Sequence, residues 1–306
     1  MGIHLMWDVL IPVAPALIAI APGLWRNICP LSITAFLPTR LQRQRKAIPD
    51  RRTATTLQLI AVAALYLIVP LRHALLDTHA TATALALLAM GVAALTMGWV
   101  FDYKSGWCVG LCPVHPVERL YGQNPARTFS NAHCAQCQQC SLPCPDSTPH
   151  IHPLSARKTW QQRLGGLLMV GGFPGFIWGW FHVPDYEAFP TAAQWLQVYA
   201  WPLGGAALTL ALYLLCRLWV PDKTLTRLFA AAAISCYYYY RIPCLTGFGL
   251  YPGDGMLVDL RHAVPATLVW TLALLPAIFF FWWLVWRPQR RQSWLVRPAF
   301  AKKRYR

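Results

Sequence analysis

The chain is short of charge, and of negative charge most of all. Only 12% of its 306 residues are Asp, Glu, Lys or Arg, and 11 acidic residues stand against 27 basic ones. An ordinary soluble domain has about twice that charged fraction. Hydrophobic residues make up 56% of the chain, which excludes a disordered polypeptide and a secreted disulfide scaffold. The composition predicts an all-α integral membrane protein.

The N-terminal region lacks the features of a removed signal peptide. Its first apolar run has no basic segment before it and no small-residue cleavage site, and it contains Asp8. We therefore expect a retained helix.

Seven apolar runs are long enough, or nearly so, to cross a hydrocarbon core of about 30 Å, which takes about 20 helical residues. The sixth is the weakest, because Arg227 lies near its start and the run Tyr237–Tyr240 near its end. The runs cover residues 5–24, 56–76, 81–101, 164–181, 197–218, 225–242 and 265–286.

The basic residues orient these runs. With the N-terminus outside and seven crossings, every Lys and Arg lies inside except Arg72, Arg241 and Arg261. Such asymmetry follows the positive-inside rule, so the net charge of +16 predicts no nucleic-acid partner. The charge asymmetry predicts a multi-pass protein of the bacterial inner membrane with a periplasmic N-terminus. The expected organisation is helices 1–3 in residues 1–101 with a basic loop at 26–55, a cytoplasmic loop at 102–163, helices 4–7 in 164–286, and a basic cytoplasmic tail at 287–306 that contacts anionic lipid.

The strongest motif lies in the loop at 102–163. Cys134, Cys137, Cys140 and Cys144, followed by Pro145, form the pattern C-x2-C-x2-C-x3-C-P of bacterial ferredoxins. Three thiolates at three-residue intervals let one tight loop reach three corners of a cubane. Structural zinc usually takes two Cys pairs a dozen or more residues apart, and disulfides are disfavoured on the reducing side. The loop is therefore predicted to be ferredoxin-like and to bind a [4Fe–4S] cluster.

The complete ligand set stays open at this point. In two-cluster ferredoxins the fourth Cys of this run binds the other cluster, and the chain has no second full motif. Cys29, Cys108 and Cys112 are candidate additional ligands, with Cys112 favoured, because all three fall near the predicted inner ends of helices 1 and 3. They bring the inside cysteines to seven, whereas two all-cysteine cubanes need eight. One cluster is expected, and two would need a non-cysteine ligand.

The stretch Trp107–Pro113, which contains Cys108 and Cys112-Pro113, precedes the Cys134–Pro145 motif in a membrane chain. This arrangement resembles the NapH/MauN/NosR family of ferredoxin-type membrane proteins over roughly the first two thirds of the chain. The resemblance implies electron transfer between the quinone pool, or a soluble donor, and a partner redox enzyme. The chain departs from the family pattern in having one ferredoxin motif instead of two. Trp25 also occupies the position four before Cys29.

Three functions are consistent with these residues. The first is an iron–sulfur electron-transfer subunit, such as that of a quinol dehydrogenase-like complex, with no catalytic acid or base. The second is a maturation reductase that delivers electrons to a metal, for example copper, or to a thiol of another enzyme. The third is a structural cluster that braces a membrane scaffold.

A second group of candidates maps to the predicted outer face. His4, His73, His79, His182 and His262 gather there, and imidazoles serve haem, copper and quinol sites, although they also hydrogen-bond headgroups and water. Asp8 is a further candidate, because an intramembrane carboxylate indicates a functional site. Cys236 and Cys244 are either an exported thiol pair or unrelated cysteines. Electrons can pass between the cluster and a quinone site near the inner helix ends without a further cofactor. A site at the outer face needs a haem or a second centre as an electron relay.

Overall fold

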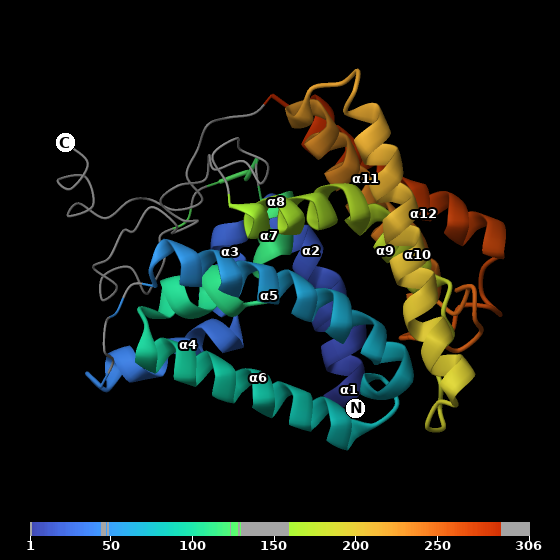
Figure 1. Cartoon of the computed structure of the whole chain (residues 1–306). Coiled ribbons are helices and arrows are strands. Elements are labelled where there is room, and N and C mark those ends of the chain that lie inside the picture. The colour runs from blue at the N-terminus through green and yellow to red at the C-terminus, as the bar shows by residue number, and fades with distance from the viewer. Residues whose placement is uncertain are drawn as a thin grey trace. The chain divides into compact units, whose positions relative to one another are not determined.

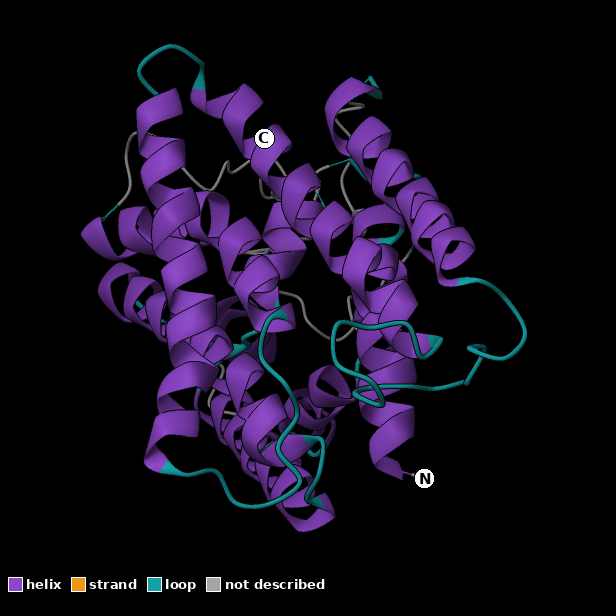
Figure 2. Ribbon diagram, turned by 90° about the vertical axis from the view of Figure 1, so that its right-hand side faces the viewer, coloured by secondary structure: helices purple, strands orange, loops and turns teal. Residues whose placement is uncertain are grey.

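The structure, a computed structural model, describes residues 2–43, 47, 49–122, 124–127, 129 and 159–288. Among these residues it is helical without a β-strand (Figure 2), and an isolated β-bridge joins Ala47 and Phe101. Residues 130–158 and 289–306 lie outside the described residues, and with them lie the predicted cluster motif and almost all of the basic tail.

The helices are labelled along the chain in Figure 1. The α-helices are α1 (Gly2–His4), α2 (Ile11–Ile20), α3 (Pro22–Ile28), α4 (Pro30–Arg40), α5 (Arg51–Leu71), α6 (Ala80–Val100), α7 (His115–Tyr121), α8 (Trp160–Leu167), α9 (Phe173–Phe181), α10 (Ala192–Cys216), α11 (Asp222–Leu245) and α12 (Ala266–Phe281). Wider π-helical turns occupy Leu5–Leu10, Arg72–Leu76, Lys104–Leu111, Leu168–Gly172 and Trp282–Trp286.

Five helices are long and apolar enough to span a membrane. They are Arg51–Leu76, Ala80–Val100, Trp160–Phe181, Ala192–Cys216 and Ala266–Trp286. Each coincides with a run expected from the sequence, so the expectation of an all-α protein with membrane-length helices is confirmed for these five. Leu85, Leu88 and Val92 on α6 are largely exposed, as side chains that contact lipid would be.

The other two expected spans have different properties. The first run is a shorter apolar helix, Leu5–Ile20, and it ends where Ala21 leaves the helical conformation before Pro22. The sixth is α11, whose 24 residues are long enough to cross but include four consecutive tyrosines and Arg241. The expectation of seven spans therefore stays a prediction at these two places.

The chain divides into two compact units, which are described separately. Unit 1 contains residues 1–13, 66–84 and 166–288, and unit 2 contains residues 14–65, 85–165 and 289–306. Helices α2, α5, α6 and α8 contribute residues to both units.

Close helix packing dominates unit 1. Gly175 of α9 and Gly205 of α10 meet backbone to backbone, and the carbonyl group of Gly205 leaves no room for a Cβ atom at Gly175. The hydroxyl group of Thr209 accepts a hydrogen bond from the Gly175 amide at 3.1 Å. Small residues that allow such an approach are typical of helix pairs in membranes. Helix α10 itself begins in a capping box formed by Thr191 and Gln194.

Unit 2 is built around an aromatic core. Phe36 packs edge-on against Tyr103 with ring centroids 4.9 Å apart, and Trp107 is buried in the same cluster. Gly98 of α6 lies directly against the backbone carbonyl group of Ala35 in α4. Two of the three candidate additional ligands, Cys108 and Cys112, belong to this core.

The π-helical turns carry several of the buried polar residues. The Asp77 amide donates to the Arg72 carbonyl group five residues back at 3.0 Å, and Cys112 donates to Trp107 at 2.9 Å. The turn at Arg72 follows Pro70, which cannot donate an amide hydrogen bond. A wider turn rotates the side chains that follow it, and such turns are frequent at functional sites.

Candidate functional site

The four motif cysteines, Cys134, Cys137, Cys140 and Cys144, lie outside the described residues. His133, His150 and His152 of the same loop lie there too. The structure does describe both flanks of this loop in unit 2. The Ala126 amide donates to the carbonyl group of Ile20 at 2.7 Å, and Gln162 donates to Gln58 at 3.2 Å.

Two of the candidate additional ligands, Cys29 and Cys112, have the same local geometry. Each ends one helical segment and precedes a proline, with ψ angles of 117° and 120°. A residue before proline is pushed into this extended region by the proline ring. Cys29 donates its amide to Trp25 at 3.0 Å, as Cys112 does to Trp107. Both Cys-Pro pairs therefore end a helical segment one turn after a buried tryptophan, with an α-helical turn before Cys29 and a wider π-helical turn before Cys112.

Burial keeps these thiols protonated. It raises the pKa of Cys108 to about 12, despite the opposing charge of Arg26 and a hydrogen bond with Ser32. Burial also raises the pKa of Cys29 and takes that of Cys112 well above its ordinary value, and the other cysteines add to the effect on Cys112. A thiolate at these positions needs a bound cation beside it, because thiolate is the form that binds metal.

An ion pair lies in the same unit. Arg26 Nη2 is 2.7 Å from Glu118 Oε2, and both side chains are almost fully buried. His115 Nδ1 is 3.4 Å from Arg26 Nη2 and 3.3 Å from Glu118 Oε2. Burial, followed by the charge of Arg26, takes the pKa of His115 well below its usual value, so this imidazole is neutral. Sequence reasoning missed Arg26 and Glu118 as a pair, since nothing in their spacing links them.

No group of three His, Cys, Asp or Glu side chains is arranged to hold a metal ion in the part of the chain that the structure describes. Cys29, Cys108 and Cys112 therefore do not form a metal site among themselves. Their role as remote ligands of a cluster stays a prediction.

The most extensive polar site is in unit 1. Asp8 is 2% exposed, and its Oδ1 atom lies 2.6 Å from Arg241 Nη2 and 3.2 Å from Arg72 Nη2. Its other oxygen is 2.8 Å from His4 Nδ1. Arg72 is also paired with Asp77 at 2.8 Å, whereas Arg241 has Asp8 and the carbonyl group of Trp7. One buried carboxylate thus joins two buried guanidinium groups.

A histidine and two further carboxylates extend this site. His73 Nδ1 is 2.5 Å from Asp185 Oδ1, and the backbone amide of Asp185 donates to Asp254 Oδ2 at 2.7 Å. We call the whole set the ionic network. It consists of Asp8, Arg72, His73, Asp77, Asp185, Arg241 and Asp254, all in unit 1.

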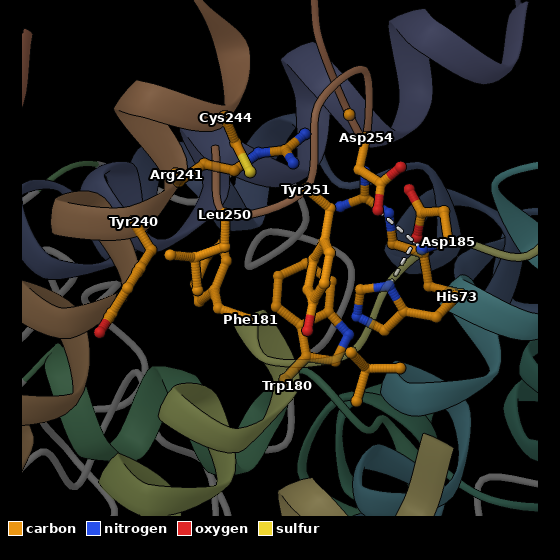
Figure 3. Close-up of a pocket in the computed structure, with 13 residues that line it drawn as sticks. His73, Trp180, Phe181, Asp185, Tyr240, Arg241, Cys244, Leu250, Tyr251 and Asp254 are labelled. Atoms are coloured by element: carbon orange, nitrogen blue, oxygen red, sulfur yellow. Dashed lines mark hydrogen bonds and ion pairs between the residues drawn. The ribbon is translucent and has the colours of Figure 1, made fainter. Parts of the chain in front are cut away.

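A small cavity of about 20 Å³ adjoins the ionic network (Figure 3). His73, Asp185 and Asp254 line one part of it, and the rings of Trp180, Phe181, Tyr240 and Tyr251 line another. Gly255, at φ +57°, carries its loop so close to Arg241 that a Cβ atom would lie 2.6 Å from Nη1. The cavity has room for about one water molecule.

The carboxyl groups that lie in the loops of this network have shifted pKa values. Burial, and then the negative charge of Asp185, raises the pKa of Asp254 to about 6. Burial also raises the pKa of Asp77 against the effect of Arg72. Burial opposes ionisation of Asp185, but the hydrogen bond and charge of His73 prevail and lower its pKa.

The outer-face histidines thus separate into groups. His73 belongs to the ionic network, and His4 pairs with its Asp8. His182 packs on Trp178 with ring centroids 4.2 Å apart, and its Nδ1 lies 2.7 Å from the Trp178 carbonyl oxygen. His79 and His262 are not brought to the network, so the five do not form one site. Cys236 and Cys244 are free thiols, and Cys244 lines the cavity.

Together, the helices and the two polar clusters define an all-α chain with membrane-length helices and buried ionisable groups. No family model, curated protein or solved structure matches this chain.

Proposed function

We propose that the protein is a membrane-bound iron–sulfur electron carrier that passes electrons between the quinone pool, or a soluble donor, and a partner redox enzyme. The observation that carries this proposal is the spacing of Cys134, Cys137, Cys140 and Cys144 before Pro145. These thiolates would hold one [4Fe–4S] cluster, and the cluster would supply single-electron transfer.

The described residues support this function through the surroundings of the loop. Both flanks of the loop belong to unit 2, as do Cys29, Cys108 and Cys112. The backbone amides of Ser32 and Leu31 act to lower the pKa of the Cys29 thiol, and that of Val114 acts to lower the pKa of Cys112, although burial prevails in both. Hydrogen bonds from such amides stabilise a thiolate bound to iron and tune its reduction potential. Cys112 or Cys29 would therefore suit a remote cluster ligand.

The ionic network supports the seven-span topology. It brings the N-terminal Asp8, the end of Arg51–Leu76, Asp185 and the loop with Asp254 into one cluster of unit 1. Each stretch of chain between these points must leave this end of the unit and return. Crossings by Leu5–Ile20 and by α11, in addition to the five long apolar helices, would account for this return. With seven crossings, the positive-inside rule would put the N-terminus on the side opposite the basic loops, which is the periplasmic side if the membrane is the bacterial inner membrane.

The decisive experiment measures iron and sulfide per chain on protein purified without oxygen, with EPR spectra before and after dithionite. About four of each and a reducible cubane signal are expected. Cys137→Ser should abolish the signal, and Cys216→Ser, on α10, should leave it unchanged. About eight of each would mean that the additional cysteines bind a second cluster. Zinc in place of iron would refute the electron-transfer function.

A further inference from the structure

The ionic network holds more negative than positive groups. It contains four carboxyl groups, those of Asp8, Asp77, Asp185 and Asp254, against the two guanidinium groups of Arg72 and Arg241. Excess negative charge is costly away from water, and a buried site relieves the cost by binding protons. The composition of the network therefore favours proton uptake.

His73 indicates that the cavity is the place of this uptake. The side chain of His73 is almost fully buried, and its Nδ1 atom lies 2.5 Å from Asp185 Oδ1. Its Nε2 atom has no hydrogen-bond partner among the described residues, although the ring lines the cavity. A buried ring nitrogen without a partner calls for a hydrogen-bonding group in the cavity, and the volume suits a water molecule.

Asp254 lies where solvent protons would enter. It lines the same cavity as His73, is only partly buried, and is held by the Asp185 amide. Figure 3 shows His73, Asp185 and Asp254 in succession along one side of the cavity. Burial and the neighbouring Asp185 charge raise the pKa of Asp254 to about 6, so this carboxyl group exchanges its proton within the physiological range.

The other charged and titratable groups around these three come from every adjoining segment. The segment that contains His73 adds Arg72 and Asp77, and the N-terminal segment adds Asp8. Helix α11 adds Tyr240, Arg241 and Cys244, and the loop after it adds Tyr251.

We propose that His73, Asp185 and Asp254 form a proton-acceptor site that exchanges protons with solvent through a water molecule in the cavity. A proton from solvent binds the Asp254 carboxylate, and the cavity water hydrogen-bonds to Nε2 of His73. The Asp254 carboxyl group is then neutral, and this protonated form is the one that the site holds at low pH. One proton is taken up, and no electron moves. This site does not depend on the iron–sulfur function.

The test is pH-difference infrared spectroscopy on the full chain in lipid nanodiscs. A protonated carboxyl band should be present at about pH 5 and lost by about pH 7.5, with a midpoint set by Asp254. Asp254→Asn should remove this band. Asp259→Asn is the matched control, because Asp259 lies in the same loop, is exposed, and pairs with Arg261 at 2.7 Å. It should leave the band unchanged.

Two further variants test the roles within the site. Asp185→Asn removes the negative charge that raises the pKa of Asp254, so the midpoint should fall. His73→Gln removes the group whose positive charge lowers that pKa, so the midpoint should rise. Opposite shifts would confirm the arrangement, whereas a purely structural role would not separate the two variants. If the wild-type protein shows no band that titrates over this range, or both variants shift it in the same direction, the proposal is wrong. The wild-type titration decides the matter even if a variant fails to fold.

Discussion

Neutralising Asp8 should destabilise unit 1 severely, because this carboxylate is the only acidic partner of Arg241 within the described residues. Asp8→Asn preserves the shape of the side chain and leaves the Arg241 guanidinium group buried without a counter-charge. Arg72 keeps Asp77 at 2.8 Å, so the cost falls mainly on Arg241. Removing one partner of a buried ion pair costs about 3–5 kcal/mol of unfolding free energy. For a unit of this size we expect a fall in melting temperature of about 10 °C.

Thermal unfolding in mild detergent, followed by tryptophan fluorescence, measures this change. The matched control is Asp259→Asn, which removes an exposed carboxylate and should not shift the transition measurably. The double variant Asp8→Asn with Arg241→Gln removes both charges and should recover much of the loss, because a neutral pair has no uncompensated charge. If Asp8→Asn unfolds with the control, or if the two substitutions are simply additive, the network does not stabilise the unit as argued.

Three other changes test separate features. Glu118→Gln removes the carboxylate that lies 2.7 Å from the buried Arg26 guanidinium group and should lower the unfolding free energy by about 3–5 kcal/mol in the same assay. Gly175→Ala has no room for its methyl group and should cost about 1–3 kcal/mol, whereas Gly204→Ala, with open space around it, should be tolerated. In metal-free protein the Cys108 thiol, with a pKa of about 12, should react with maleimide about a thousandfold more slowly at pH 7 than an ordinary cysteine. Mass spectrometry of the labelled chain measures that rate, and rapid labelling would contradict the burial of this residue.

Hydrophobicity and charge asymmetry predict the helices well because each long span is a local property of about 20 consecutive residues. The span Ala266–Trp286, for example, begins within a residue of the expected run at 265–286 and ends with it. The two spans that stay predictions are those where local chemistry conflicts with a crossing. Prolines and the break at Ala21 interrupt the first run, and Arg241 and the tyrosine run lower the apolarity of α11. In α11 the charge of Arg241 is balanced by Asp8, a tertiary partner that the local sequence does not reveal.

The ionic network was less accessible to sequence reasoning, because its members come from segments far apart in the chain. Asp8 and Arg241 are separated by 233 positions, and His73 and Asp185 by 112. The sequence marked Asp8 and His73 as candidates on general grounds, but it contained no spacing that would pair either with its partner. The Cys134–Cys144 motif is the opposite case, since four cysteines within eleven residues predict a cluster site from their spacing alone, without any tertiary contact.

One sequence signal did point to the network. The expected topology places Arg72, Arg241 and Arg261 on the outer side against the general charge asymmetry. Arg261 is exposed and pairs with Asp259 in its own loop, so it needs no further explanation. Arg72 and Arg241 are buried and share Asp8. Four of the 11 acidic residues of this basic chain belong to the same network. Arg72 and Arg241 depart from the positive-inside rule, and acidic residues gather beside them. Both facts have one cause, because each buried arginine at this end of unit 1 requires a carboxylate. In a membrane chain, the acids predicted on the outer side are therefore the first candidates for partners of a basic residue predicted on that same side.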